Sequence, residues 1–344
     1  MSVRKIAKTL ELSPSTVSLA LRSSPKISEE TRDKVLKEAT RLGYRPNAKL
    51  NELMSHLRLN STGPNVACFG VVSFYDTLRP WERSKHLSYI YEAMQARGEA
   101  LGYRLESLGL KAPGMTPARF RSVLDARGIQ GLLCFGSPNV EEEFPNELDH
   151  YAVVTVGLSI STPLHRVTSH FFNDLYRTLD KLHRIGYRRP GLLLNEYEEG
   201  RTAHVYPSAY LGWCEHVLGN PLLMPILRTS EVSAERTLEW FRSNRPDVIV
   251  CVHHRREVEK LQKILQSNGI SVPRDVGIAA VTQLLEGTEL SGMQQNQRLM
   301  GEWAVELLAS RIMNQNFGIP DNPRIELVES EWIEGTTLLS GKWN

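Results

Sequence analysis

The alternation of short apolar runs with longer helix-like segments over residues 66–340 most strongly constrains the fold. The runs lack polar alternation, which is typical of strands buried on both faces of a parallel sheet. They comprise Val66–Val72, Gly131–Phe135, Tyr151–Val156, Gly191–Leu194, Val248–Val252 and Val276–Val281, with a weaker run at Pro225–Leu227. Helix-like segments lie at 85–101, 118–127, 175–185, 208–218, 233–243, 255–267 and 301–313. This order predicts a parallel α/β body. It continues for too long to form one sheet, so we expect two lobes.

Charge separates a basic head from this body. Residues 1–60 contain 12 Lys and Arg against 6 Asp and Glu, whereas the other residues contain 29 against 33. The net charges are therefore +6 and −4, although the whole chain of 344 residues carries only +2. A basic head on a mildly acidic body indicates that the head alone meets a polyanion.

The cysteines and the hydropathy pattern predict a cytoplasmic protein. Three of the four cysteines, Cys68, Cys134 and Cys251, lie inside apolar runs, and with Cys214 they show no metal-ligand spacing. Buried free thiols in a reducing cytosol are therefore expected. No segment approaches the ~18 consecutive apolar residues of a membrane span. The first residues show no signal-peptide pattern.

The N-terminal segment 3–22 predicts two short amphipathic helices joined by a tight turn. Ile6, Ala7 and Leu10 share one face of the first helix, and Val17, Ala20 and Leu21 share one face of the second. Ser13 is a favourable N-cap, and Pro14 suits the first helical position. This pattern is typical of a helix-turn-helix, whose second helix enters the DNA major groove. A small helical hairpin with a solvated face is the alternative.

Two further helices are predicted before the body. Ser28 caps a third helix with acidic residues in its first turn, and Gly43 ends it. Residues 48–57 form a short apolar-faced helix that requires a partner, because ten residues do not hold a helix in water. Residues 60–65 are a linker by composition.

Motifs throughout the head, in the same order and spacing, resemble the DNA-binding region of the LacI/GalR (lactose-repressor) family of transcriptional regulators. The matching motifs are Ile6-Ala7, Ser13-x-x-Thr16-Val17-Ser18, Ala20-Leu21, Ile27-Ser28-x-x-Thr31-Arg32 and Gly43-Tyr44-x-Pro46-Asn47. The resemblance implies an all-α helix-turn-helix headpiece at 1–46, a hinge helix and linker at 47–64, and a ligand-binding core at 65–340. It also implies a homodimer on a pseudo-palindromic operator, with Leu53 wedged into the minor groove.

The DNA-contacting residues follow from the helix-turn-helix and from the resemblance. Leu19 departs from the family, since many relatives carry an arginine there that reads a base, whereas leucine at best contacts a thymine methyl group. Ser15, Ser18 and Arg22 are therefore the expected base readers, and Lys5, Lys26, Thr31 and Tyr44 the expected phosphate contacts. The complete predicted set is Lys5, Ser13, Pro14, Ser15, Thr16, Ser18, Leu19, Arg22, Lys26, Ser28, Thr31, Tyr44, Asn47 and Leu53.

Weaker landmarks extend the resemblance into the body, at Gly186–Pro190, Pro246-Asp247 and Val272–Gly277. They imply a periplasmic-binding-protein-like core of two α/β lobes with parallel sheets, between which the chain crosses near Pro163, Ser291 and Asp321. The expected N-lobe comprises about 65–162 and 291–321, and the C-lobe about 163–290 and 322–340.

A small-molecule effector is expected in the cleft between these lobes, because ligands of open α/β sheets bind at the carboxyl ends of the strands. Three positions depart from the pattern of sugar-responsive relatives, namely Ala209, His253-His254 and Thr282. The aromatic and polar residues that remain favour a planar or glycan-like ligand, a saccharide included. Core packing of the aromatics is the alternative. The predicted contacts are Phe74, Tyr75, Asp76, Trp81, Ser137, Tyr206, His253, Thr282 and Gln295.

Enzymatic interpretations find little support in the motifs. The chain has no Gly-x-Gly-x-x-Gly after a strand, no P-loop and no Gly-x-Ser-x-Gly elbow. His253-His254 is a poor chelate, since adjacent strand residues point to opposite sides, and Glu141–Glu143 fits a solvated helix face. We therefore expect no enzyme, no cofactor and no metal, but a ligand-controlled transcriptional regulator, with repression the expected sign. The alternative is a cytosolic small-molecule-binding protein or Rossmann-like enzyme that does not bind an operator.

Overall fold

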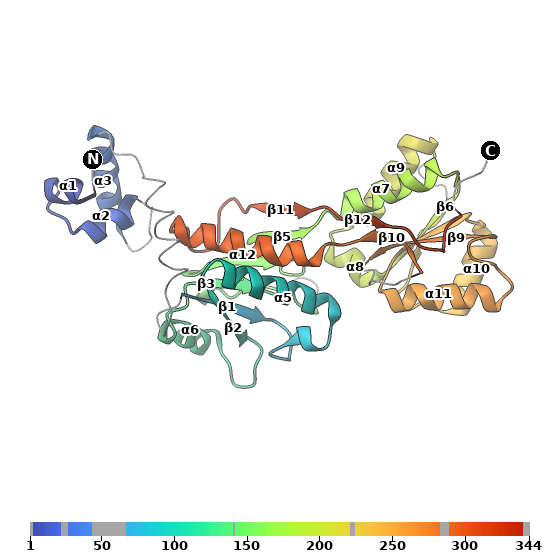
Figure 1. Ribbon diagram of the computed structural model, residues 1–344, viewed down its shortest axis with the longest axis horizontal. Coiled ribbons are helices and arrows are strands. Elements are labelled where there is room, and N and C mark those ends of the chain that lie inside the picture. The colour runs from blue at the N-terminus through green and yellow to red at the C-terminus, as the bar shows by residue number, and fades with distance from the viewer. Residues whose placement is uncertain are drawn as a thin grey trace. The chain divides into compact units, whose positions relative to one another are not determined.

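The computed structural model describes residues 3–21, 27–42, 67–139, 142–220, 224–282 and 289–339. The head contains three helices, α1 (Val3–Thr9), α2 (Pro14–Leu21) and α3 (Glu29–Arg41) (Figure 1). Helices α1 and α2 carry the apolar faces predicted from the sequence. The buried side chains of all three helices form one core of Ile6, Ala7, Val17, Ala20, Val35 and Ala39. The head therefore has a hydrophobic core of its own.

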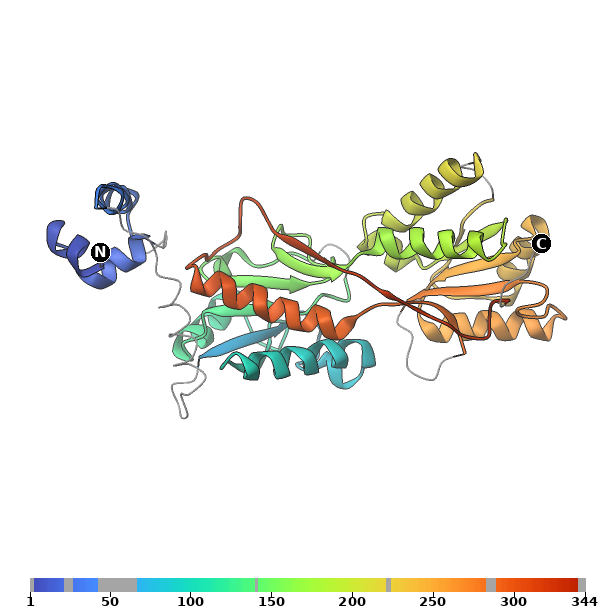
Figure 2. The ribbon, with the colours of Figure 1, turned by 45° about the horizontal axis from the view of Figure 1, so that its top comes forward.

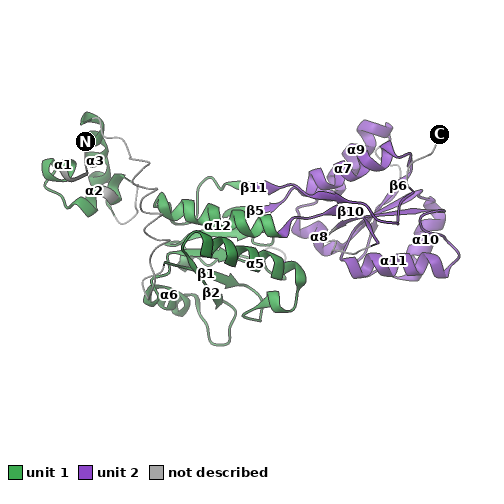
Figure 3. Cartoon of the chain, in the orientation of Figure 1, with its two compact units in different colours: residues 1–138, 142–167, 298–325 green, residues 139–141, 168–297, 326–344 purple. Residues whose placement is uncertain are grey.

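Two compact units divide the chain (Figure 3). Unit 1 comprises residues 1–138, 142–167 and 298–325, and unit 2 comprises 139–141, 168–297 and 326–344. Apart from the short segment 139–141, the chain thus passes between the units after residues 167, 297 and 325, each a few residues later than the sequence suggested. The reason in the first case is that the strand at 165–169 pairs within the sheet of unit 1.

A six-stranded sheet in the order β11-β5-β4-β3-β1-β2 forms the centre of unit 1, and the strands from β5 to β2 in this order pair in parallel. Helices α5 and α12 lie side by side along it (Figure 2), and Gly301 permits this because a Cβ atom there would lie 2.3 Å from the carbonyl oxygen of Ile90. The elements are β1 (Cys68–Ser73), η1 (Pro80–Glu82), α5 (Lys85–Ala100), β2 (Arg104–Gly109), α6 (Pro117–Ala126), β3 (Gly131–Cys134), η2 (Asn146–Leu148), β4 (Ala152–Val156), β5 (His165–Ser169), α12 (Gln297–Met313) and β11 (Ile325–Val328).

Unit 2 repeats this architecture around a sheet in the order β12-β10-β9-β8-β6-β7. Helices α7 and α9 lie on one face and α10 and α11 on the other (Figure 1). The sheet is parallel except at its end, where β12 runs antiparallel to β10. Its elements are α7 (Phe171–Arg184), β6 (Pro190–Leu194), α8 (Glu196–Arg201), α9 (Val205–Leu218), β7 (Leu227–Arg228), α10 (Ala234–Asn244), β8 (Val248–Val252), α11 (Arg255–Ser267), β9 (Gly277–Thr282), β10 (Ser291–Gln294) and β12 (Glu331–Ile333).

Strand order identifies one functional edge in each unit. In unit 1 the chain leaves β1 toward β2 on one side and later returns to β3 on the other, so the order reverses between β1 and β3. The same reversal occurs between β6 and β8 in unit 2. Ligands of open α/β sheets bind at such switch points, beyond the carboxyl ends of the strands. Residues 74–76 and 135–137 occupy this position in unit 1, and residues 195 and 253 occupy it in unit 2.

The predicted parallel α/β body and the helical head are confirmed by this architecture. All four cysteines are buried free thiols, as predicted. Among the described residues, no helix is both long enough and apolar enough to span a membrane.

Candidate DNA-binding and effector sites

The turn between α1 and α2 sets the geometry of the helix-turn-helix. Glu11 adopts a left-handed conformation with φ 55°, and the Leu12 amide donates a hydrogen bond of 2.9 Å to the Ala7 carbonyl oxygen. This bond closes the end of α1 in the manner of a Schellman motif, where glycine is the usual residue. Ser13 then caps α2, because its Oγ accepts a hydrogen bond of 3.0 Å from the Thr16 amide. The predicted cap is therefore present.

The face that α2 presents to solvent carries most of the predicted DNA contacts. Pro14 and Ser15 are exposed, and Thr16 and Leu19 are partly exposed. The Ser13 hydroxyl lies 2.7 Å from that of Ser15 and 2.8 Å from that of Thr16. The start of α2 thus displays a cluster of hydroxyl groups above a closed apolar core, which is suitable for contacts with phosphates and base edges.

The other predicted DNA contacts divide between described and undescribed residues. Lys5 is exposed on α1, and Ser28 is the exposed N-cap of α3, where its hydroxyl donates to Thr31 Oγ1 at 2.9 Å. Helix α3 pairs its own charges, as in Lys34–Glu30. Outside the described residues lie Arg22, Lys26, Tyr44, Asn47, Leu53 and the side chain of Ser18.

Aromatic side chains gather beside the switch point of unit 1. Trp81 is buried and stacks on Tyr91 with ring centroids 4.0 Å apart, and it also lies 5.2 Å from Phe135. Phe74 is only 2% exposed and packs in the hydrophobic core beneath this edge of the sheet, so its ring is not available to a ligand. Asp76 is exposed, and Tyr75 is partly exposed with its amide bonded to a serine hydroxyl of β1.

Ser137 brings polar chemistry to the same edge. Its amide donates to Ser159 Oγ at 2.8 Å, and its hydroxyl donates to Glu142 Oε2 at 3.0 Å. The Lys111 ammonium group lies 2.7 Å from the other oxygen of Glu142. The interpretation of Glu142 as part of a solvated helix face was wrong, because this carboxylate lies outside any helix and is held by a hydroxyl and an ammonium group.

Asn195 and His253 meet at the switch point of unit 2. Asn195 Oδ1 accepts the Glu198 amide at 3.1 Å and caps α8, and the nitrogen of its side-chain amide lies 3.1 Å from His253 Nε2. Burial, and next the charge of His254, lower the pKa of His253. Asn195 was not among the predicted contacts, although it directly follows β6 and therefore lies at the carboxyl end of a strand.

Helix α8 adds charged groups beside this pair. Arg201 forms an ion pair with Glu198 and lies over the Phe171 ring, 5.5 Å from its centroid. Phe171 in turn contacts the buried ring of Tyr206. Burial raises the pKa of Tyr206, and the nearby Gln295 side chain offsets a small part of that rise. The structure therefore brings together two predicted contacts, Tyr206 and Gln295.

Thr282 is the last residue of β9, and its side chain lies outside the described residues.

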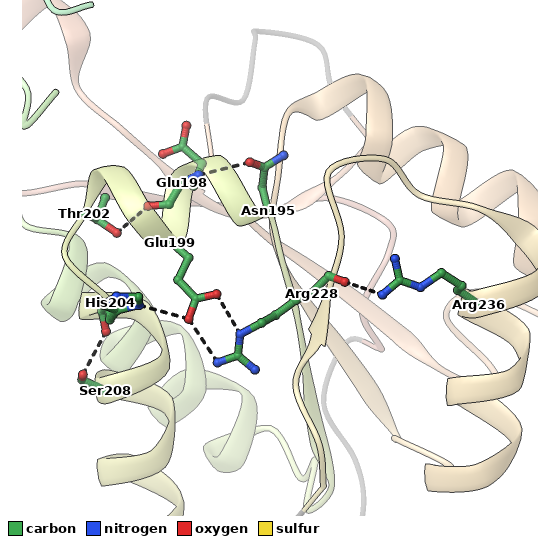
Figure 4. A network of polar contacts seen from close by, with 8 residues as sticks. All are labelled: Asn195, Glu198, Glu199, Thr202, His204, Ser208, Arg228 and Arg236. Atoms are coloured by element: carbon green, nitrogen blue, oxygen red, sulfur yellow. Dashed lines mark hydrogen bonds and ion pairs between the residues drawn. The ribbon is translucent and has the colours of Figure 1, made fainter. Parts of the chain in front are cut away.

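A second polar network fixes the connection from α8 to α9 (Figure 4). The Glu199 carboxylate accepts bonds of 2.7 and 3.1 Å from Arg228 and lies 3.2 Å from His204 Nδ1. Burial raises the pKa of Glu199, but Arg228 and His204 outweigh it, so the pKa lies below its usual value. The network holds Ala203 and His204 in left-handed conformations, with φ of 50° and 59°. It therefore determines where α9 begins.

A helix-turn-helix head joined to a body of two parallel-sheet units defines a class of protein, the ligand-regulated DNA-binding transcriptional regulators. Residues 2–47 match the family described as bacterial regulatory proteins, lacI family, and residues 179–338 match the periplasmic binding protein-like domain. The head thus matches the family that its motifs predicted.

Known proteins resemble this chain along nearly its whole length. Catabolite control protein A of Staphylococcus epidermidis (strain ATCC 12228 / FDA PCI 1200) is 22% identical, and the match covers 98% of this chain and 99% of that protein. The Lac repressor dimer bound to operator and the anti-inducer ONPF has 16% identity and a TM-score of 0.59, with 99% of each chain covered. The complex of the transcriptional regulator CelR with cellobiose has 16% identity and a TM-score of 0.58, covering 98% and 99% of the two chains. These two solved structures show a shared fold.

Proposed function

We propose that this regulator is a cytoplasmic repressor that binds a pseudo-palindromic operator as a homodimer. The observation that carries the proposal is the exposed start of α2, where Pro14 and Ser15 stand above the closed core of the head. The net charge of +6 on residues 1–60 supports it, because phosphate contacts dominate the affinity for DNA. The segment 47–64 supplies the hinge in this proposal, with Leu53 as its wedge.

A charge placed on α2 tests this proposal. An operator is first selected from random duplexes with the full chain, and its affinity is then measured by fluorescence anisotropy. Ser15→Glu places a carboxylate at a helix start, where the helix dipole tolerates it, but next to phosphate on bound DNA. We expect a loss of at least about tenfold in affinity, because like charges repel across an interface.

Ser122→Glu is the matched control, since Ser122 is an exposed residue of α6 in unit 1 and the substitution changes the net charge equally. It should leave the affinity for the operator within about twofold, because a single remote charge is screened by salt. Equal losses in the two variants would refute α2 as the DNA-reading helix. A failure to enrich any symmetric motif would favour the alternative, a small-molecule-binding protein without an operator.

We also propose that the effector binds at the carboxyl ends of the parallel strands and is a saccharide or another ring-shaped, hydroxyl-rich molecule. Support comes from the buried Trp81 and the Ser137–Glu142 pair in unit 1, and from the Asn195–His253 pair in unit 2. Aromatic faces combined with a few fixed polar groups are typical of such sites. That CelR was solved with cellobiose agrees with this proposal.

A thermal-shift screen of sugars, glycan fragments and purines identifies the effector, because a ligand that binds the folded state raises the melting temperature. The variants His253→Gln and His254→Gln then locate it. His253 is buried at the switch point, whereas its neighbour is exposed, so the two changes are chemically matched. We expect the shift to be lost only in His253→Gln. A shift that both variants retain would place the effector elsewhere.

A further inference from the structure

Three basic side chains meet at the edge of unit 1 opposite to the proposed effector site. His165 is the first residue of β5, Arg324 precedes β11, and Arg311 lies in the last turn of α12 (Figure 1). Because β5 runs parallel to β4, its first residue lies at the amino edge of the sheet. The switch-point residues lie at the carboxyl edge, so this cluster is a separate feature.

The protonation of His165 follows from its hydrogen bonding. The backbone amide of Arg324 donates to His165 Nδ1 at 2.8 Å. That nitrogen is therefore an acceptor, and the ring proton resides on Nε2. His165 Nε2 is buried and has no hydrogen-bond partner among the described residues. A buried N–H group without an acceptor costs free energy, so its presence indicates an acceptor that comes from outside the described residues, such as a bound anion.

Arg311 presents a second donor of this kind. Its Nε atom is also buried without a hydrogen-bond partner in the described part of the chain. The charges of the cluster act on one another. Burial, followed by the charges of Arg311 and Arg324, lowers the pKa of His165 to about 4. Burial and the charge of Arg324 lower the pKa of Arg311. The charges of two guanidinium groups thus act on the buried His165 ring, and a like-charged cluster of this kind favours an anion beside it.

We propose that His165, Arg311 and Arg324 bind a small oxyanion, either free phosphate or the phosphate group of a small metabolite. The planar fork of arginine matches phosphate oxygens, and its bonds to them are charge-assisted. The neutral imidazole contributes one further donor from the floor of the site. The protein therefore carries a second ligand site, at the opposite edge of unit 1 from the site where we propose that the effector binds.

Melting of the full chain tests this site without DNA and without the effector. Melting temperatures are measured by scanning fluorimetry in increasing potassium phosphate and in potassium chloride of equal ionic strength. The variants are Arg311→Gln and His165→Asn, of which the second retains an acceptor for the Arg324 amide. The control is Arg298→Gln, which removes the same charge from the exposed first turn of α12.

The result is the increment that phosphate adds to each protein's own melting temperature in chloride, so a variant of lower stability still gives an answer. For the wild type and Arg298→Gln we expect a saturable increment of at least about 2 °C at ten times the dissociation constant. Both site variants should lose it. A wild type without a saturable increment, or site variants with the same increment as the control, would overturn the proposal.

Discussion

Replacing Asp174 by asparagine should remove most of the pH dependence that this carboxyl group gives to the stability of unit 2. Asp174 lies in the first turn of α7, is 0% exposed, and has no hydrogen-bond partner for either carboxylate oxygen among the described residues. Burial raises its pKa to about 7. The nearby Ser330 hydroxyl offsets part of that rise without completing a hydrogen bond.

The charged groups around Asp174 have smaller effects of both signs. Glu329 raises the pKa further, whereas His170 and Arg177 lower it. His170 and Arg177 both contact Glu329 instead, since its carboxylate lies 2.8 Å from His170 Nδ1 and 3.1 Å from Arg177 Nη1. The pKa of Asp174 is therefore raised mainly because its carboxyl group is buried and lacks a hydrogen-bond partner among the described residues.

The magnitude follows from the difference between the folded and unfolded states. An unfolded aspartate has a pKa near ~3.9, so the folded state holds the proton about 3 pKa units more tightly, which corresponds to about 4 kcal/mol. This stability is fully present below about pH 4 and is lost as the pH rises toward the folded pKa of about 7. Between pH 5 and pH 8 the wild type should lose about 2–3 kcal/mol from this group. Asp174→Asn does not titrate and should lose none of it.

Urea denaturation at pH 5 and pH 8, followed by tryptophan fluorescence, measures this difference. Trp213 is buried in unit 2 and reports on its unfolding. Glu239→Gln, which makes the same chemical change at an exposed position of α10, should keep the pH dependence of the wild type. If Asp174→Asn and Glu239→Gln show the same dependence, the reasoning about the buried carboxyl group is refuted.

Three further substitutions test separate features. Glu11→Gly relieves a left-handed backbone and should stabilise the head by about 1 kcal/mol in thermal melts, whereas Glu11→Ala, with the same strain, should not. Glu199→Gln leaves Arg228 without its charged partner and should lower the free energy of unfolding, measured in urea, by about 1–3 kcal/mol. Glu259→Gln, which breaks the surface ion pair with Arg255, should lower it by less than about 0.5 kcal/mol. Leu53→Ala should weaken operator binding in anisotropy titrations while the circular dichroism spectrum stays unchanged; wild-type affinity would contradict the wedge.

Much of the fold could be predicted because buried parallel strands have a distinct composition. The runs at 131–135, 151–156 and 248–252 contain almost only apolar residues, and each forms a buried strand. β5 was not predicted, because His165–Ser169 contains polar residues, yet all five residues are buried. Strand β5 lies between β11 and β4 in the sheet. Its burial therefore depends on β11, a segment that is far away in the sequence.

In the candidate sites, too, features that depend on neighbouring residues in the sequence were predicted, whereas features that depend on distant residues were not. Ser13 and Ser28 were identified as helix caps because capping depends on the next three residues, and both bonds are present. His253 was found because it follows an obvious strand. Arg201 was missed, because its position depends on an ion pair with Glu198 and on a ring that comes from another helix. No local pattern signals that arrangement.

The central claim is that the head binds DNA with sequence specificity through phosphate contacts as well as base contacts. The most direct measurement is the affinity of the full chain for its selected duplex as a function of potassium chloride concentration. If the two heads of a dimer together neutralise six phosphates, the logarithm of the association constant should fall linearly with the logarithm of salt with a slope of about −5. The selected sequence should also be symmetric. A slope near zero, or a selection without a symmetric motif, would contradict the claim.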